Sequence, residues 1–144
     1  MRKVSAVRDS VHRAKGSRGD MTALLACIGG VDIAALTGML MQAAARKTPV
    51  ILDGVVVASA ALVAHRIDFR SRQWWIAGHR STEPAHAIAL DRLDLSPVLD
   101  LEITHEEGIG GLLAVPVVRS AIAVLTECDP EDVASGAAHA PVSD

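Results

Sequence analysis

Aromatic side chains are scarce in this 144-residue chain, where Phe and Trp together make up 2% of the residues and Tyr is absent. Half of the residues are nevertheless hydrophobic, and nearly all of these are Ala, Val, Leu and Ile. A chain of about 150 residues hides roughly two-thirds of its unfolded surface when it folds. We therefore expect one domain whose core consists of small and branched aliphatic side chains.

Cysteine is also rare, since Cys27 and Cys128 are the only two and lie far apart. They form neither a CxxC pair nor the spacing of a zinc site, and we expect both to be reduced. No apolar segment typical of a secretion signal follows the basic start. The longest apolar stretch, residues 48–64, contains Asp53 and Gly54 and falls short of the roughly 20 residues of a membrane span. We therefore expect a cytoplasmic protein that does not contact a membrane.

The net charge is only −3, but it is unevenly distributed. Residues 1–18 contain six Lys or Arg side chains and a single acid, Asp9. A nucleic-acid-binding arm would need aromatic side chains for base stacking, and this segment has none. We interpret the basic residues as a solvated helix face and expect no nucleic-acid partner.

The N-terminal third has the pattern of helices. Val4, Val7 and Val11 follow helical spacing over residues 3–13, and residues 15–20 have the composition of a linker. Asp20 can cap a short helix that ends at Gly29-Gly30. The next segment, residues 31–46, is apolar nearly all round and predicts a buried helix.

From residue 49 on, short apolar runs alternate with helical segments. The predicted strands are residues 49–52, 74–77 and 98–103, and the helices that follow them are residues 55–66, 83–93 and 112–127. Strands separated by such helices pair in parallel with right-handed crossovers, and strands this apolar should be covered on both faces. We expect an α/β fold with an open, mostly parallel, three-layer, Rossmann-like sheet of about three strands.

These patterns divide the chain into three parts. Residues 1–19 form a basic helix and linker, residues 20–128 form the α/β domain, and residues 129–144 form a tail with too little apolar content to pack.

Ligands of open parallel sheets bind at the carboxyl ends of the strands, where loops lead into helix N-termini. Three loops satisfy this rule. The first, Asp53-Gly54, places a carboxylate where it could accept hydrogen bonds from a pair of ribose hydroxyls, or else cap the next helix. The second, residues 78–82, combines a glycine that allows close approach with a hydroxyl and a cation, although Ser81 or Thr82 could equally cap the following helix.

His79, Glu83 and His86 have a spacing that could suggest a metal site. His79 precedes the helix, however, and only Glu83 and His86 share a helical face. We therefore predict no metal at this position.

The third loop is Glu106-Glu107-Gly108-Ile109-Gly110-Gly111. Its glycines let the backbone approach a ligand closely, and a carboxylate from which water is partly excluded could act as a general base. The alternative is a glycine-rich turn with solvated acids.

Four blocks of this sequence, in order, resemble one known family. They are Ile28-Gly29-Gly30-Val31-Asp32-Ile33-Ala34-Ala35, Thr48-Pro49-Val50-Ile51-Leu52-Asp53-Gly54, Gly78-His79-Arg80-Ser81-Thr82-Glu83-Pro84-Ala85-His86, and Leu99-Asp100-Leu101 before Glu107-Gly108-Ile109-Gly110. The family is that of the nicotinate-nucleotide:dimethylbenzimidazole phosphoribosyltransferases of cobalamin biosynthesis, and the resemblance covers about residues 20–128, the C-terminal part of the family's sequence.

The resemblance implies transfer of a phosphoribosyl group from nicotinate mononucleotide to 5,6-dimethylbenzimidazole, giving α-ribazole 5′-phosphate and nicotinate. It implies that Glu107 is the catalytic base and that Asp53, Gly54, Ser81, Gly108 and Gly110 bind substrate near the ribose and phosphate. It also implies a homodimer and no metal or redox cofactor.

Two departures from the family pattern concern activity. The family's Arg-Leu-Gly-Glu-Gly-Thr-Gly is here Thr104-His105-Glu106-Glu107-Gly108-Ile109-Gly110, so an arginine, a glycine and a threonine are lost. Family members are also considerably longer, and their N-terminal half has no counterpart in this chain. The resemblance therefore implies an incomplete or partner-dependent enzyme, with an N-terminal half as partner chain. The alternative is a non-catalytic module that binds nucleotide phosphate or another protein.

Overall fold

The computed structural model describes residues 2–17, 19–104 and 107–127. The elements in chain order are α1 (Arg2–Arg13), the 3-10 helix η1 (Ala14–Ser17), α2 (Met21–Ile28), α3 (Val31–Ala45), β1 (Val50–Leu52), α4 (Gly54–Ile67), the 3-10 helix η2 (Phe69–Trp74), β2 (Trp75–Ser81), α5 (Pro84–Leu93), β3 (Pro97–Ile103) and α6 (Ile109–Glu127). The predicted order of helices and strands is confirmed. The predicted tail, residues 129–144, lies outside the described residues.

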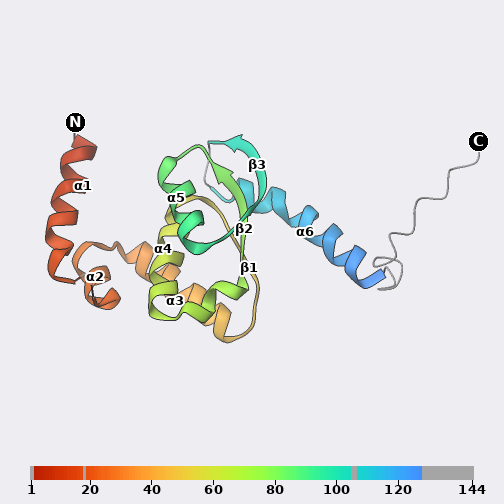
Figure 1. Ribbon diagram of the computed structural model, residues 1–144, viewed down its shortest axis with the longest axis horizontal. Coiled ribbons are helices and arrows are strands. Elements are labelled where there is room, and N and C mark those ends of the chain that lie inside the picture. Colours follow the sequence, from red (N-terminus) through yellow and green to blue (C-terminus); the bar gives the residue numbers. More distant parts are fainter. Residues whose placement is uncertain (1, 18, 105–106, 128–144) are drawn as a thin grey trace, which may run out of the picture.

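The three strands form one parallel sheet in the order β1-β2-β3. Ile51 pairs with Ile76 and His79 pairs with Leu99. The crossover helices α4 and α5 pack against each other and against β2, while the start of α6 contacts all three strands (Figure 1). Because all strands point the same way, their carboxyl ends meet at one edge, as the α/β prediction requires.

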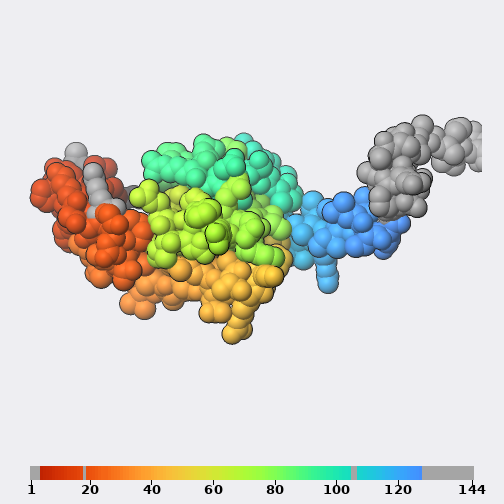
Figure 2. All heavy atoms as spheres, turned by 60° about the horizontal axis from the view of Figure 1, so that its bottom comes forward, coloured from red at the N-terminus to blue at the C-terminus, as the bar shows by residue number. Residues whose placement is uncertain are grey.

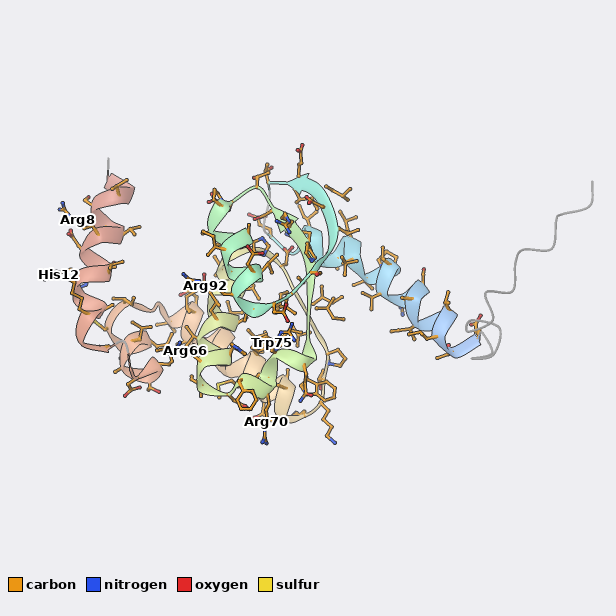
Figure 3. The ribbon with its side chains drawn as sticks, viewed as in Figure 1. Arg8, His12, Arg66, Arg70, Trp75 and Arg92 are labelled. Carbon is orange, nitrogen blue, oxygen red and sulfur yellow. The ribbon has the colours of Figure 1, made fainter. Side chains whose placement is uncertain are left out.

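The core lies between the sheet and helices α3 and α4. Its buried members are small aliphatic residues and one indole: Leu40, Leu52, Ala60, Ala61, Ala64, Trp75 and Leu93. The alanines on α4 allow α3 to approach closely. Trp75, labelled in Figure 3, is at the start of β2 and is therefore at the end of the sheet opposite to the strands' carboxyl ends.

Two burial predictions are wrong. Helix α3 was expected to be buried all round, but only Thr37, Leu40 and Ala44 are buried, and Val31 is 88% exposed. The strands were expected to be covered on both faces. This is true of the central strand β2, whereas most of β3 is half-buried or exposed because it is an edge strand with no neighbour on its outer side in the described chain.

Two boundaries also differ from the prediction. Residues 78–81 were expected in a loop, but they complete β2, where they pair with β3. The last helix was expected to begin at residue 112, but α6 begins at Ile109 and contains Pro116 in its interior. Part of the predicted glycine-rich loop is therefore the first turn of a helix.

The predicted cap of α2 is confirmed. The Asp20 carboxylate accepts hydrogen bonds from the backbone N–H groups of Thr22 at 2.8 Å and Ala23 at 3.1 Å, and Gly29 ends the helix. We expect Asp20→Ala to lower the free energy of unfolding by about 1 kcal/mol, while Asp20→Asn keeps a capping oxygen and changes it little. Urea denaturation followed by circular dichroism measures both variants. An equal loss of stability in Asp20→Ala and Asp20→Asn would show that the capping oxygen contributes nothing.

Helix α6 leaves the α/β unit after its first two turns. Gly110 and Ala114 are buried, but Leu112 and Leu125 are 72% and 80% exposed, and Figure 2 shows the blue helix extending away from the other coloured elements. In the part of the chain that the structure describes, α6 is the one helix long and apolar enough to cross a membrane by length and composition. Core helices of globular proteins meet the same criteria, so this feature alone indicates an apolar surface.

Candidate active site

Polar side chains gather at the carboxyl edge of the sheet. Asp53 follows β1, His79 and Ser81 are in the last part of β2, and His86 projects from α5. All four are buried, with exposed fractions of 8% or less. The loop that carries Glu107 and the first turn of α6 close over this cluster, because two backbone N–H groups from that segment donate to Asp53. The structure thus brings all three predicted loops together.

The Asp53 carboxylate caps α6. Its Oδ2 accepts from the N–H of Gly108 at 2.7 Å, and its Oδ1 accepts from the N–H of Gly111 at 3.0 Å. Asp53 also precedes α4, yet its side chain makes no capping hydrogen bond to that helix. The expectation that it caps the next helix in the chain is therefore wrong, because its oxygens satisfy the N-terminal N–H groups of a helix more than fifty residues away.

His79 is completely buried beneath the same turn. Its Nε2 lies 2.7 Å from Asp53 Oδ1, an ion-pair distance without hydrogen-bond geometry. Its Nδ1 has no hydrogen-bond partner among the described residues. Gly110 lies directly on the ring, since a Cβ added there would be 2.0 Å from His79 Cδ2. Only a glycine therefore lets the first turn of α6 lie this close to β2.

Ser81 is held by His86. Both the backbone N–H and the Oγ of Ser81 lie within hydrogen-bond distance of His86 Nδ1, at 3.1 and 2.9 Å. A backbone N–H can only donate, so Nδ1 is the acceptor and the ring proton is on Nε2. The single lone pair of Nδ1 already accepts this N–H, so the contact with His86 holds the Ser81 hydroxyl in place without fixing the direction of its proton. Neither Ser81 nor Thr82 caps α5 with its side chain, contrary to the alternative expected for this segment.

Glu107 is exposed and immediately precedes Gly108, so its carboxylate is solvated, as in the alternative given for this loop, and the expected partial exclusion of water is wrong. Among the described residues its carboxylate has no hydrogen-bond or ion-pair partner, so its position depends on its backbone. Gly108 adopts a φ of 86°, a left-handed conformation that favours glycine, and a Cβ there would meet open space. His105 and Glu106 lie outside the described residues.

Gly54 also has a left-handed backbone, with a φ of 76°, and is buried at the first turn of α4. The spacing of His79, Glu83 and His86 does not produce a metal site, since within the described ranges no group of three or more His, Cys, Asp or Glu side chains could hold a metal.

A separate hollow of about 660 Å³ lies at the other end of the molecule. Met21, Leu24, Leu62, His65, Arg66 and Arg92 line it. Figure 3 shows Arg66 and Arg92 on the side that faces α2. These cations belong to the last turns of α4 and α5, where they complement the helix dipoles, so the hollow is a weaker candidate for a ligand.

The sequence patterns did not identify His79 and His86 as part of the polar cluster at the carboxyl edge of the sheet. His79 and His86 were considered only as metal ligands, whereas their rings lie 5.6 Å apart inside a buried polar cluster. The available signal was a histidine in an otherwise apolar strand, which must find a polar neighbour when it is buried.

An open parallel sheet with polar groups at its carboxyl edge is the architecture of enzymes that bind nucleotides. A family model described as phosphoribosyltransferase matches residues 1–135, so this chain belongs to that phosphoribosyltransferase family. The match is longer than the resemblance seen from the four sequence blocks and includes α1.

The curated relatives carry a more specific name. Proteins named nicotinate-nucleotide–dimethylbenzimidazole phosphoribosyltransferase from Streptomyces avermitilis and Mycobacterium avium are 57% identical over 127 residues and 54% identical over 125 residues. These segments are 88% and 87% of this chain, but only 34% and 36% of the relatives. The chain therefore spans about a third of the length of the curated relatives that it matches.

Solved structures agree with the fold. A crystal structure of the enzyme of the same name from Thermus thermophilus superposes with a TM-score of 0.72 at 32% identity, over 81% of this chain and 35% of that one. A crystal structure of CobT from the same organism gives a TM-score of 0.69 at 36% identity, over 72% and 31%. The open α/β sheet is thus the one found in these enzymes.

Proposed function

We propose that this chain carries the catalytic-base side of a phosphoribosyltransferase that moves the phosphoribosyl group of nicotinate mononucleotide to 5,6-dimethylbenzimidazole in cobalamin assembly. The observation that supports this proposal best is the exposed Glu107 at the carboxyl edge of the sheet, on a loop fixed by Asp53. We place the reaction in the cytoplasm, with no metal or redox cofactor.

Glu107 acts as the general base. One ring nitrogen of dimethylbenzimidazole attacks C1′ of the ribose, and the C1′–N bond to nicotinate breaks, so that nicotinate leaves with the bonding electrons. The second ring nitrogen then carries a proton that has become acidic, and the Glu107 carboxylate accepts it. The products are α-ribazole 5′-phosphate and nicotinate.

The nucleotide is bound by Ser81 and by three glycines of the edge. The Ser81 hydroxyl lies 2.9 Å from His86 Nδ1, which holds it at the edge that we propose for the ribose and phosphate of the nucleotide. Gly108 keeps the backbone free of a side chain where the sugar and phosphate approach, since a Cβ there would meet open space. Gly54 and Gly110 stay predicted contacts of the same groups through their backbones.

The rest of the family fold completes the site. The apolar surface of α6, formed by Leu112, Leu113, Val117, Ile122, Val124 and Leu125, is exposed, and about two-thirds of each curated relative has no counterpart in this chain. An exposed apolar surface of this kind marks a contact with another polypeptide. We infer that the missing two-thirds covers α6 and supplies the groups for the aromatic base and the phosphate.

The test measures nicotinate release from nicotinate mononucleotide and dimethylbenzimidazole in three samples. They are the chain alone, the chain co-expressed with the remaining two-thirds of the Streptomyces avermitilis relative, and a chimera in which the chain replaces the matched third of that relative. We expect no release from the chain alone and release from the other two samples. No release in any sample would refute the catalytic proposal.

Variants of α6 test the covering. Leu112→Ser with Leu125→Ser should reduce release by the co-expressed pair at least about tenfold, since the apolar burial of two leucine side chains is lost, while the covalent chimera is less affected. Val4→Ser on α1 is the matched control, because Val4 is 74% exposed. The binding-module alternative would be favoured if the chain alone bound the nucleotide, Glu107→Gln did not alter this binding, and no sample transferred the phosphoribosyl group. Self-association without nucleotide binding would favour an interaction domain.

A further inference from the structure

Asp53 is a buried carboxylate whose oxygens are both in use. It is 8% exposed, and it accepts the N–H groups of Gly108 and Gly111 on separate oxygens. Hydrogen bonds to an ionised acceptor are the strongest kind in proteins. The Gly108 N–H belongs to the peptide bond that begins at Glu107, so this hydrogen bond fixes the backbone of the proposed base directly.

His79 and Gly78 of β2 pack against this turn. The His79 ring is in contact with Gly110, and its Nε2 lies 2.7 Å from Asp53 Oδ1. One residue earlier in β2, a Cβ on Gly78 would be 3.0 Å from the Gly111 Cα. The first turn of α6 is thus held in two ways, by hydrogen bonds to the residue that follows β1 and by steric contact with β2.

We propose that Asp53 and His79 are positioning residues that clamp the turn after Glu107 and thereby hold the base in place. This inference rests on the proposed role of Glu107 and assigns Asp53 a different task from the ribose contact expected from the resemblance. A substrate hydroxyl would have to compete with two backbone donors for a carboxylate that is almost inaccessible to solvent. The exposed Glu107 has no side-chain partner of its own in the described part of the chain, so the clamp sets its position.

Asp53→Asn tests the clamp without removing the side chain. An amide has one accepting oxygen, so one of the two backbone hydrogen bonds is lost while the shape is kept. Hydrogen exchange of the Gly108 and Gly111 amides, followed by NMR on the full chain, should become at least about tenfold faster, which corresponds to the loss of one charge-assisted hydrogen bond. Asp91→Asn, at an exposed position of α5, is the matched control and should leave both rates unchanged.

A second measurement needs no variant. A scalar coupling across the hydrogen bond, from the Gly108 amide nitrogen to the Asp53 carboxylate carbon, should be observable in the unmodified chain. Unchanged exchange in Asp53→Asn, or absence of this coupling, would overturn the clamp.

Kinetics of the chimera then separate positioning from substrate binding. A displaced base should lower kcat by about 10²-fold, with little change in the KM for nicotinate mononucleotide. A raised KM with an unchanged kcat would instead assign Asp53 to the ribose and overturn the proposal. If Asp53→Asn does not fold, Gly78→Ala serves in its place, since its methyl group would lie 3.0 Å from Gly111 Cα and displace the same turn. If the unmodified chimera releases no nicotinate, the proposed function fails, while exchange and coupling still decide whether the clamp exists.

Discussion

Glu107→Gln is expected to slow phosphoribosyl transfer by the chimera by about 10² to 10⁴-fold, the usual contribution of a general base. Glutamine has nearly the shape of glutamate but cannot accept the proton that the attacking benzimidazole must lose. The KM for nicotinate mononucleotide should change little, because Glu107 acts on the other substrate. Nicotinate release under saturating substrates measures the effect.

A control and a rescue experiment make this prediction specific to proton transfer. Glu127→Gln, an exposed glutamate at the far end of α6, should leave the rate unchanged. Glu107→Ala leaves space for a small carboxylate, so added formate should restore part of its rate, whereas Glu107→Gln should not respond to formate. A Glu107→Gln chimera with an unaltered rate would show that another group accepts the proton.

Gly110→Ala is expected to lower the free energy of unfolding of the full chain by about 2 kcal/mol, within the usual range for overpacking a buried site. The new methyl group would lie 2.0 Å from His79 Cδ2 and 2.3 Å from Cγ. His79 is completely buried, so the ring cannot swing into solvent, and either the sheet or the start of α6 must move. Urea denaturation measures the loss.

Gly38→Ala is the matched control. Gly38 is inside α3, and a Cβ there meets no atom within 4 Å. Alanine is a better helix former than glycine by about 1 kcal/mol, so this variant should be slightly more stable than the unmodified chain. The two variants make the same chemical change in a helix, so the difference between their free energies of unfolding isolates the contact with His79. Equal shifts for both would show that α6 does not rest on His79.

The fold was largely predictable from local patterns. Apolar runs at residues 49–52, 74–77 and 98–103 separated by helical segments predict parallel strands, because short crossovers allow few other arrangements. Asp20 and Gly29 predict the ends of α2 through local hydrogen bonds and backbone conformation. Prediction failed where the burial of a surface depends on a neighbour from elsewhere in the chain. Helix α3 is apolar on most sides, yet its outer surface has no cover among the described residues.

The candidate site was predictable in its parts but not in its connections. The three segments at the strand ends were identified, and the structure does bring them to one edge. What could not be deduced from the sequence is which group binds which. The partners of Asp53 are 55 and 58 residues away, and His79 was expected in a loop although it belongs to β2. A carboxylate and an imidazole each have several ordinary partners, and only the folded backbone selects among them.

The sequence by itself determined the order of elements, the parallel sheet and the presence of an acid, Glu107, among glycines at a strand end, because these features depend on neighbouring residues and on periodicity. Only the tertiary structure decided that Asp53 caps α6, that His86 Nδ1 accepts a hydrogen bond from the Ser81 N–H, and that Gly110 packs against His79. Each of these contacts joins segments separated in the chain or requires a specific approach of two backbones. Such contacts form only when the sheet has placed the segments side by side, and burial then makes a polar partner necessary for each group.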